Sequence, residues 1–462
     1  MTEPIASQYD VVIVGAGVVG SALGATFGRQ GRRVLLIERD WAEPDRIVGE
    51  LLQPGGVRAL EKLGLRQCLE DIDAINVVGY AISYHGENVS IAYASDHNAP
   101  EKTLEGRSFH HGRFVSKLRE AAKNSPNVTV LEATVNEIIS DKVTSQILGV
   151  RCSNRKTELS EYYYGALTVV ADGTFSKFRR DYISTPVQIR SHFVGIVLKD
   201  AVLPTPRHGH VILGDHPPIL VYQIGSNETR MLVDVQGKLP SAANGDLKRH
   251  LEGVVSASIP ACLLPSFKAA MQTERLRSMP NSYLPPSAND THGLLLLGDA
   301  YNMRHPLTGG GMTVALNDIV LISDLLSPAR VPSFDDTNLV VSQLNEFYWK
   351  RKNLSTVINI LAQALYALFA ANDSRLRRLQ NGCFRYFQRG GIYVSEPIGL
   401  LSGILPVPFL LISHFFQVAL YSIYVLFQDA TWSQYPALTV ESVSVFWKAC
   451  LVVLPMLWSE WR

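Results

Sequence analysis

The sequence predicts an α/β fold in three parts, on the basis of three features. Residues 9–38 show a strand, a glycine-rich turn, a helix and a second strand, the pattern of a Rossmann-like dinucleotide-binding domain. A β-rich stretch interrupts the α/β pattern, and the long uncharged apolar runs are confined to the last third of the chain. We therefore expect a cofactor-binding domain in two parts, over 1–184 and 283–340, with residues 76–106 contributing to the substrate side. A β-rich substrate-binding domain over 185–282 is inserted between these parts, and an α-helical region follows over 341–462.

The glycines of the first motif each have an expected role. Gly15 permits a tight turn, Gly17 lets the backbone approach a pyrophosphate, and Gly20 with Gly24 lets the helix pack closely on the sheet. The N–H groups at the start of this helix would face the phosphates, which adds Val18 and Val19 to the predicted contacts.

An acidic residue ends the second strand of the motif. Glu38 lies 18 residues after Gly20, where a carboxylate can accept hydrogen bonds from a ribose diol. Because this acid would repel a 2′-phosphate, the motif favours FAD or NAD over NADP. The alternative is a glycine-rich turn that binds no ligand.

Charge and metal-ligand spacing exclude two classes of protein. The 462 residues carry 43 Lys and Arg against 42 Asp and Glu, a net charge of +1, so no strong field attracts a nucleic acid. The five cysteines are far apart, in no zinc-binding spacing. His110-His111 and His208-Gly-His210 lack the spaced Cys, Asp or Glu partners that a metal site needs. We therefore expect neither a nucleic-acid partner nor a metal.

Two segments after the first motif each contain a candidate site residue. The loop 48–56, Val-Gly-Glu-Leu-Leu-Gln-Pro-Gly-Gly, places Gln53 directly before a helix, where simple helix capping is the alternative role. Residues 77–93 alternate like a hairpin around a turn at 85–88, with Tyr80 on the apolar face.

Two later strands also end in an acid beside glycine. The first, over 166–173, ends in Asp172-Gly173 and could hold a phosphate or ribose edge, with a solvated turn as the alternative. The second ends in Gly298-Asp299 and is followed by Pro306-Leu-Thr-Gly-Gly-Gly-Met312, which runs into a helix over 313–326. There, three glycines (Gly309, Gly310 and Gly311) let N–H groups and a helix start approach an anion, while Asp299 accepts hydrogen bonds from hydroxyl groups.

Two separate contacts with one extended cofactor favour FAD over NAD. NAD needs only the first glycine motif, whereas FAD, with its ribityl chain and isoalloxazine, needs both. The start of the second helix carries about half a positive charge, which would also stabilise an anionic reduced flavin.

The last third of the chain predicts membrane association. Residues 375–395 hold five arginines and no acid, and residues 397–428 hold no Asp, Glu, Lys or Arg. The part after Pro408 is 20 residues long, enough to cross or lie within a bilayer. Four of the six tryptophans fall in the last 31 residues, as they do at a membrane interface. We expect a monotopic helical hairpin in membrane lipid, with the arginines near anionic headgroups; the core of a soluble helical domain is the alternative.

Several motifs resemble a known family. The first glycine motif, Asp172-Gly173 and Gly298-Asp299 together resemble the FAD-dependent monooxygenases of the p-hydroxybenzoate hydroxylase fold. Within that group the resemblance is to the squalene epoxidases, carried by Asp45-Arg-Ile-Val-Gly-Glu-Leu-Leu-Gln-Pro-Gly-Gly56, Met279-Pro-Asn-Ser-Tyr-Leu-Pro285 and Asn302-Met-Arg-His-Pro-Leu-Thr-Gly-Gly-Gly-Met-Thr313. Two departures are Thr313, where the fold-wide motif has Asn, and the absence of the long N-terminal extension of the animal enzymes. We therefore expect the C-terminal helices to be the anchor.

The resemblance also implies roles for individual residues. Gln53 and Tyr80 are implied to lie beside the flavin in the substrate pocket, as the residues closest to catalysis. Together with the motif residues derived above, the expected FAD-binding set is Gly15, Gly17, Val18, Val19, Gly20, Glu38, Arg39, Arg46, Arg113, Val135, Asp172, Gly298, Asp299, Pro306, Gly309, Gly310, Gly311 and Met312.

The activity implied by the resemblance is epoxidation of the terminal double bond of squalene to (S)-2,3-oxidosqualene in sterol synthesis, with O₂ and through a C4a-hydroperoxyflavin. Electrons would come from NADPH through a separate diflavin reductase, at the cytosolic face of the endoplasmic reticulum membrane or of microsomes or lipid droplets. Such chemistry needs a dry apolar cavity more than catalytic side chains. The alternatives are another FAD oxidoreductase of this fold acting on a polyprenoid, and a prenyl-protein escort protein without redox chemistry.

Overall fold

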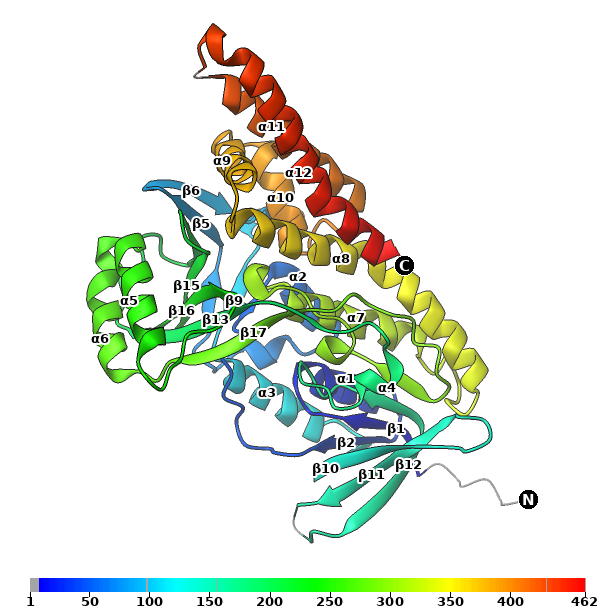
Figure 1. The fold of residues 1–462 in the computed structure, drawn as a ribbon. Coiled ribbons are helices and arrows are strands. Elements are labelled where there is room, and N and C mark those ends of the chain that lie inside the picture. Colours follow the sequence, from blue (N-terminus) through cyan, green and yellow to red (C-terminus); the bar gives the residue numbers. More distant parts are fainter. Residues whose placement is uncertain (1–7, 97–98, 156, 429, 462) are drawn as a thin grey trace.

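A parallel sheet forms the centre of the cofactor-binding half. The structure is a computed structural model that describes residues 8–96, 99–155, 157–428 and 430–461 (Figure 1). The strands lie in the order β10-β2-β1-β12-β18, all parallel, and β11 joins the far ends of β10 and β12 in antiparallel pairing. The bounds are β1 Tyr9–Val14, β2 Val34–Glu38, β10 Val128–Ser140, β11 Ile147–Asn154, β12 Ser160–Val170 and β18 Leu294–Leu296.

The register brings four strand ends to one edge of this sheet. Val14 at the end of β1 lies between Ile37 of β2 and Val170 of β12, and Val170 in turn pairs with Leu296 of β18. The residues that follow these strands, which hold both predicted glycine motifs and their acids, therefore meet at one edge. Ligands of open α/β sheets bind at this carboxyl edge.

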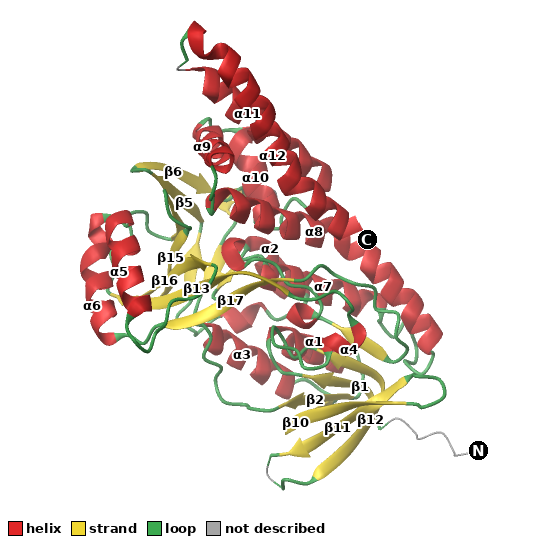
Figure 2. Ribbon diagram, in the orientation of Figure 1, coloured by secondary structure: helices red, strands yellow, loops and turns green. Residues whose placement is uncertain are grey.

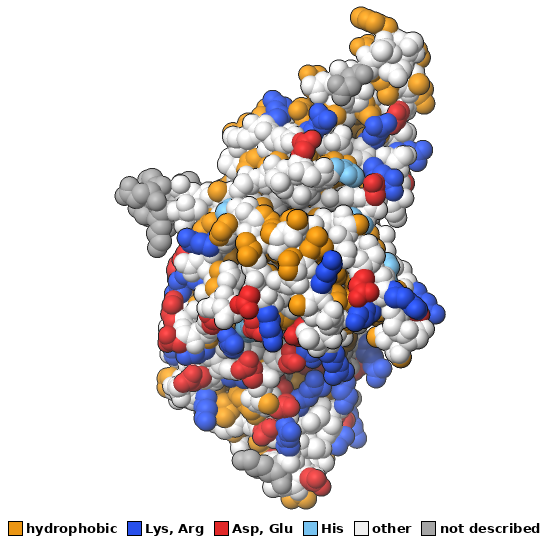
Figure 3. Space-filling view, turned by 90° about the vertical axis from the view of Figure 1, so that its left-hand side faces the viewer, with side chains coloured by type: hydrophobic (Ala, Val, Ile, Leu, Met, Phe, Trp, Pro, Cys, Tyr) orange, Lys and Arg blue, Asp and Glu red, His pale blue; other side chains and the backbone are white. Residues whose placement is uncertain are grey.

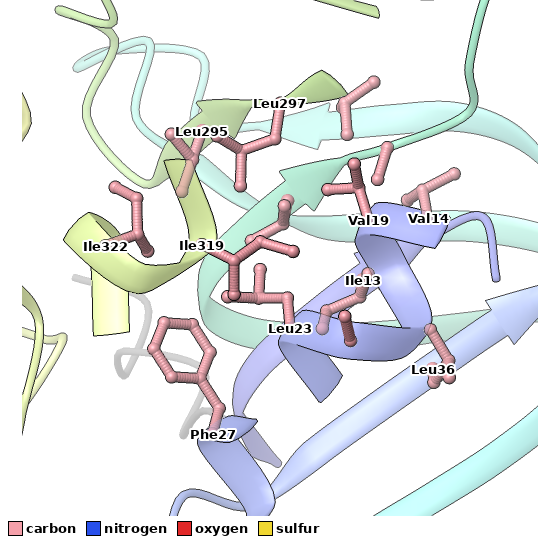
Figure 4. Packing of buried hydrophobic residues seen from close by; sticks show 14 of the residues in the cluster. Ile13, Val14, Val19, Leu23, Phe27, Leu36, Leu295, Leu297, Ile319 and Ile322 are labelled. Carbon is pink, nitrogen blue, oxygen red and sulfur yellow. The ribbon is translucent and has the colours of Figure 1, made fainter. Parts of the chain in front are cut away.

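Helices cover the sheet and close its core. α1 (Val18–Arg29) packs between α3 (His111–Lys123) and α7 (Gly311–Leu325). Figure 4 shows Leu23 and Phe27 of α1 against Ile319 and Ile322 of α7, with Ile13 and Leu295 of the strands beside them; all six side chains are fully buried. The same core contains the helix starts, so their positions at the sheet edge are fixed by packing.

A second sheet of seven strands stands beside the first. Its order is β17-β13-β16-β15-β14-β5-β6, antiparallel except between β14 and β5. One face packs on α5 (Asp246–Ser258) and α6 (Leu264–Thr273), and the other faces the C-terminal helices. The bounds are β5 Gly79–Tyr84, β6 Glu87–Ala92, β13 Gln188–Lys199, β14 His208–Leu213, β15 Ile219–Gly225, β16 Glu228–Gln236 and β17 Arg277–Tyr283.

The C-terminal helices lie over this second sheet and project beyond it. Figure 2 shows that the projecting part is helical. α8 is 33 residues long and is followed by α9 at a bend of 113°. α11 and α12 pack against each other as a hairpin. The bounds are α8 Thr337–Phe369, α9 Ser374–Gln388, α10 Ile392–Leu401, α11 Pro408–Gln428 and α12 Tyr435–Trp461.

Short elements complete the chain. They are β3 Leu51–Leu52, β4 Ile75–Val77, β7 Ser95–Asp96, β8 Ala99–Thr103, β9 Gly106–Ser108, α2 Pro54–Lys62, α4 Arg179–Tyr182 and the 3-10 turns at Arg66–Leu69, Ala261–Leu263, Gly298–Ala300, Pro306–Thr308 and Trp432–Gln434. Two details differ from the sequence analysis. The hairpin turn is shorter than 85–88, because Glu87 already pairs with Tyr84. The helix α8 begins at Thr337, so the boundary expected at 340 falls inside it; the domain division itself stays a proposal.

Candidate active site

The first end of the site is the turn between β1 and α1. Gly15 has a φ of +99°, and a Cβ built on it would lie 2.6 Å from the carbonyl oxygen of Ala171, so only glycine fits. A Cβ on Gly20 would lie 1.8 Å from the carbonyl oxygen of Gly15. Gly17 differs, because a Cβ there would meet nothing within 4 Å and Gly17 lines a cavity. Gly24, expected to permit close helix packing, is not required, since its Cβ would have ordinary contacts at 3.6 Å and beyond.

Glu38 is tied to the same turn. Its Oε2 accepts a hydrogen bond from the N–H of Ala16 at 2.8 Å, and its Oε1 accepts one from the N–H of Asp40 at 3.2 Å. Arg119 of α3, a residue that the sequence analysis missed, lies 3.6 Å from this carboxylate and donates to the carbonyl oxygen of Ala16 at 2.8 Å. The acid thus holds the glycine turn in shape at the edge where a ribose is expected.

The second end of the site is built around Asp299. Its Oδ2 accepts a hydrogen bond from Thr174 Oγ1 at 2.7 Å, and Thr174 Oγ1 accepts one from Arg46 Nη2 at 3.1 Å. Arg179, which is buried, donates from Nη2 to the carbonyl oxygens of Gly173, Thr174 and Asp299 at 2.9 to 3.0 Å. This guanidinium joins the end of β12 to the end of β18, so the two acid-bearing turns form one unit.

The three glycines at the start of α7 have different surroundings. Gly309 has a φ of +61°, and a Cβ on it would lie 3.3 Å from Gln53 Nε2. A Cβ on Gly310 would lie 2.4 Å from the Ile358 side chain of α8, so this glycine serves packing. Gly311, the first residue of α7, resembles Gly17 in having nothing within 4 Å of a Cβ. The starts of α1 and α7 therefore both have open space in front of them.

One open cavity joins these two ends. Eleven predicted residues line it: Gly17, Val18, Val19, Arg46, Tyr80, Gly298, Asp299, Pro306, Gly309, Gly311 and Met312. Two helix starts that attract anions, a carboxylate and glycines with free space fit a dinucleotide held at both ends. When bound there, FAD would supply the redox chemistry.

Other predicted cofactor residues lie outside the lining of this cavity. Arg113 is half-exposed and lies 3.6 Å from Asp73, on the outer side of α3. Val135 is buried on β10, where it pairs with Cys152 of β11. Asp172 accepts from the N–H of Lys177 at 2.9 Å, and its Oδ1 is buried without a hydrogen-bond partner among the described residues. The remaining such residues are Gly15, Gly20, Glu38, Arg39 and Gly310; Gln53, predicted to lie beside the substrate, is likewise absent from this lining. Their contact with FAD stays a prediction.

Gln53 and Tyr80 form a buried hydrogen-bonded group with Tyr93. Gln53 Nε2 donates to the Tyr80 hydroxyl and, at 2.7 Å, to the carbonyl oxygen of Thr308, while Gln53 Oε1 accepts from the Tyr93 hydroxyl at 2.7 Å. The Tyr80 and Tyr93 rings meet edge to face with centroids 6.1 Å apart. Burial raises the pKa of Tyr80 to about 12, so its hydroxyl stays protonated. The amide therefore holds the Tyr80 ring in one orientation beside the glycine loop.

Tyr80 separates the first cavity from a second one. The second cavity extends from Tyr80 toward α8, α9 and α10. Tyr80, Val211 and Leu307 line both cavities. Except for the Tyr80 and Thr308 hydroxyls, the side chains around the second cavity are hydrophobic: Ile82, Ile91, Leu361, Leu365, Phe369, Phe387, Val394, Pro397, Ile398 and Leu401. It suits a long hydrocarbon and excludes stable hydration.

Two charged or titratable groups beside the first cavity have roles that the sequence did not predict. His111 Nδ1 lies 2.8 Å from the carbonyl oxygen of Gly49, and burial lowers the pKa of His111 to about 4, with Arg46 adding to this effect. Its imidazole is therefore neutral at physiological pH. Glu50 accepts two hydrogen bonds from Arg230 at 2.8 Å, both residues being buried. That ion pair ties the loop 48–56 to β16 and hence to the second sheet.

Metal ligation finds no support in the described part of the chain, where no group of three or more His, Cys, Asp or Glu side chains could hold an ion. His110 instead lies 2.7 Å from Glu228, and His210 Nε2 accepts from the N–H of Thr205 at 3.2 Å.

Comparison with known proteins identifies the family. Residues 164–439 match the model described as "SE: Squalene epoxidase", and residues 10–185 match "GIDA: Glucose inhibited division protein A". The chain is 53% identical to "Squalene epoxidase erg1" of Aspergillus fumigatus over 98% of this chain and 94% of that protein. It belongs to the squalene epoxidase family. The mouse "Squalene monooxygenase" is 44% identical over 98% of this chain and 78% of its own length, so members of this family from fungi and mammals share the region described above.

Solved structures place the family in a wider fold. A p-nitrophenol 4-monooxygenase from Pseudomonas putida superposes with a TM-score of 0.71 at 18% identity, covering 87% of this chain and 99% of that one. A probable FAD-dependent monooxygenase from Pseudomonas aeruginosa gives 0.64 at 22%, covering 79% and 97%. The expected fold class, an α/β domain of the p-hydroxybenzoate hydroxylase type with a β-rich second domain, is thus confirmed.

Proposed function

We propose that this squalene epoxidase family member converts squalene to 2,3-oxidosqualene, with FAD in the first cavity and the hydrocarbon chain in the second. The observation that carries this proposal is the position of Tyr80, between a cavity that fits a flavin dinucleotide and a cavity lined by hydrocarbon side chains. The overall reaction balances as squalene, O₂, two electrons and two protons giving the epoxide and water. Incubation of the purified protein with squalene, NADPH and a diflavin reductase, followed by product analysis, tests it. Absence of oxidosqualene from a flavin-loaded sample contradicts it.

The chain's own residues position and protect the reactants. Arg46, through Thr174, and Arg179 hold the turn that carries Asp299. Gln53 holds the Tyr80 ring between the cavities. The apolar wall of the second cavity keeps water from the reacting alkene, which limits loss of the activated oxygen as hydrogen peroxide. No side chain needs to act as a base, since an alkene is attacked by an electrophilic oxygen.

We expect Asp299→Ala to weaken FAD binding by roughly tenfold to a hundredfold, because a hydrogen bond to a charged group contributes about 1.5–3 kcal/mol. The bound-flavin ratio after gel filtration measures this. Asp324→Ala is the matched control, since Asp324 lies on α7 but is exposed and pairs only with Arg330 at 3.1 Å among the described residues. Stoichiometric flavin in Asp299→Ala would contradict the proposed site.

Membrane association forms part of the proposal. α11 and the segment 432–460 are long and apolar enough to cross a bilayer, and only 22% of each apolar window is buried. The exposed hydrophobic residues include Phe409, Leu420, Trp447, Leu451 and Leu454. Figure 3 shows hydrophobic side chains toward the tip of the projection and Lys and Arg side chains nearer its base. Of the arginines on α9, Arg378 lies 2.9 Å from Glu441 and Arg377 lies 3.9 Å from Asp215.

We expect the triple variant Leu420→Gln, Leu451→Gln, Leu454→Gln to lose affinity for lipid vesicles while it keeps FAD, because these side chains are exposed and each contributes about 1.5–3 kcal/mol when buried in lipid. Truncation before Pro397 should release the protein from membranes too, but it removes Pro397, Ile398 and Leu401 from the wall of the second cavity and the Ser402 carbonyl oxygen that accepts from the Gly55 N–H at 2.8 Å. Flotation measures the loss of membrane binding, and turnover measures the damage to the second cavity, so the two assays together distinguish the triple variant from the truncation. Unchanged flotation of the triple variant would argue against insertion of this hairpin.

The cellular setting and electron supply follow from the same proposal. A cytosol-facing enzyme in the endoplasmic reticulum membrane would take squalene from lipid and electrons from a membrane-bound diflavin reductase that oxidises NADPH. Cell fractionation with a reductase-depleted control tests both points: activity should co-sediment with that membrane and should fall when the reductase is removed.

A further inference from the structure

A buried polar cluster connects the last turn of α12 with the glycine loop of the cofactor cavity. Arg304, which lines that cavity, donates from Nη1 to the carbonyl oxygen of Gly311 at 3.3 Å and from Nη2 to Asn302 Oδ1 at 2.5 Å. Arg351 of α8 donates to both carboxylate oxygens of Asp318 on α7, at 3.0 and 2.8 Å, and to the same Asn302 Oδ1 at 3.2 Å. One asparagine oxygen thus joins two guanidinium groups.

Glu460 enters this cluster from the C-terminal helix. Its Oε1 accepts a hydrogen bond from Asn359 Nδ2 at 2.9 Å, and its Oε2 accepts one from Thr356 Oγ1 at 3.3 Å. Asn359 Nδ2 also lies 3.2 Å from Asn302 Oδ1, which continues the connection to Arg304. Figure 1 shows this end of α12 returning to the body of the molecule beside α8. A second contact, Ser459 Oγ to the Tyr283 hydroxyl at 2.8 Å, holds the same turn against β17.

Charge balance explains why a carboxylate is placed here. Arg304, Arg351, Asp318 and Glu460 are 9%, 1%, 3% and 1% exposed. Without Glu460, the cluster would hold two guanidinium groups against the single carboxylate of Asp318. Asp299, on the neighbouring turn, is a further counter-charge for Arg304, since its hydrogen bond from the neutral Thr174 hydroxyl leaves its charge in place. A buried charge without a counter-charge is costly. Glu460 acts on the two guanidinium groups through space and through Asn359 and Asn302, since among the described residues it forms no direct ion pair with either arginine.

The two guanidinium groups also act on each other. Burial and the nearby charge of Arg351 lower the pKa of Arg304 to about 10, while Asp299, Asp318 and Glu460 oppose that change. Burial and Arg351 therefore disfavour the positive charge of Arg304 beside Gly311, and the Glu460 carboxylate from α12 is one of the groups that stabilise this charge.

We propose that Glu460, in the last turn of the apolar helix α12, is a positioning residue for the cofactor loop. Its carboxylate balances the charge of the cluster formed by Arg304, Arg351 and Asp318. This charge balance holds the segment 302–312 in the conformation that binds the flavin. The inference rests on the proposed position of FAD at the start of α7. It makes α12 part of the cofactor site as well as part of the apolar hairpin.

The test is the FAD dissociation constant of Glu460→Gln in detergent micelles, below its melting temperature. Glutamine keeps the shape and removes the charge, and it keeps one of the two oxygens that accept hydrogen bonds from Asn359 and Thr356. Coupling between two sites is typically roughly 5- to 150-fold in affinity, and we expect FAD to bind about tenfold more weakly. Glu441→Gln is the matched control, because Glu441 lies on the same helix but is partly exposed and pairs with Arg378 at 2.9 Å; its FAD affinity should equal that of the unmodified protein, and both variants should float with lipid vesicles.

A compensating substitution separates charge balance from simple anchoring of α12. Arg351→Met alone leaves Asp318 and Glu460 against Arg304, whereas Arg351→Met combined with Glu460→Gln leaves one cation and one anion. We expect the double variant to bind FAD better than the sum of the two single effects predicts, even where Glu460→Gln alone aggregates. The proposal is overturned if Glu460→Gln binds FAD with unchanged affinity. It is also overturned if the losses in the double variant are strictly additive or if the double variant aggregates. Stoichiometric FAD in Asp299→Ala would instead indicate that the flavin site itself is wrongly placed.

Discussion

Gly17→Val should give a folded protein that purifies without flavin. Gly17 precedes α1 with φ −79° and ψ −161°, a conformation that any L-residue adopts, so the substitution introduces no backbone strain. A Cβ there meets no protein atom within 4 Å and projects into the first cavity. The valine methyl groups would occupy the space that lets the cofactor pyrophosphate reach the backbone. Flavin absorbance per protein and a thermal melt without added FAD measure the two parts of this prediction.

Gly24→Ala is the control for Gly17→Val. A Cβ on Gly24 would lie 3.6 Å from Leu36 and 3.7 Å from Ile13, at ordinary contact distance. Because glycine in a helix is destabilising by roughly 0.5–1 kcal/mol relative to alanine, Gly24→Ala should bind FAD normally and melt slightly higher. A fully flavin-loaded Gly17→Val protein would show that the dinucleotide does not lie at the start of α1.

Tyr80→Ala should retain FAD and lose most production of 2,3-oxidosqualene. The trisubstituted double bonds of squalene are electronically alike, so the position of the chain must select the terminal one. Burial contributes about 0.8 kcal/mol per CH₂, and sliding the chain by one isoprene unit changes that sum little. A wall at the flavin end must therefore set the register, and Tyr80 lies between the two cavities, held by Gln53. We expect internal epoxides and more hydrogen peroxide per NADPH oxidised, which mass spectrometry and a peroxidase assay detect.

Two further variants sharpen the Tyr80 experiment. Tyr80→Phe keeps the ring and removes the hydroxyl that accepts from Gln53, so it should keep regioselectivity better than alanine does. Tyr84→Ala removes an aromatic ring from the same strand and the same face, where it meets Phe384 with ring centroids 5.3 Å apart and lines neither cavity. If Tyr80→Ala and Tyr84→Ala yield the same product spectrum as the unmodified protein, Tyr80 is a packing residue only.

Local patterns in the sequence were sufficient to predict both ends of the cofactor site. The turns at Gly15 and Gly309 have positive φ, and each sits between a strand and a helix whose hydrophobic spacing is visible in the chain. The same logic located Asp299 and the start of α7. The role predicted for Gly24 was wrong, because the sequence does not show whether a glycine in a helix is required for close packing or could be replaced by a larger residue.

Residues that act across long sequence distances escaped prediction. Arg119 contacts Ala16 and Glu38 only after α3 has packed on α1, and its helix offers other basic residues that the sequence cannot rank. His111 was considered only as a metal ligand, and its neutral state depends on burial beside Arg46.

The order of the strands in the parallel sheet has a consequence for folding and rescue. β1 sits between β2, which follows it closely in the sequence, and β12, while β18 follows the strands of the second sheet in the sequence. The starts of α1 and α7 are therefore brought together by contacts that close long loops. A ligand that contacts the starts of both α1 and α7 binds the native state and not a fragment. Its binding stabilises the folded cofactor-binding region as a whole by mass action. Excess flavin during expression should thus act as a pharmacological chaperone for destabilised variants anywhere in this unit, including those in α8, far from the cofactor in sequence.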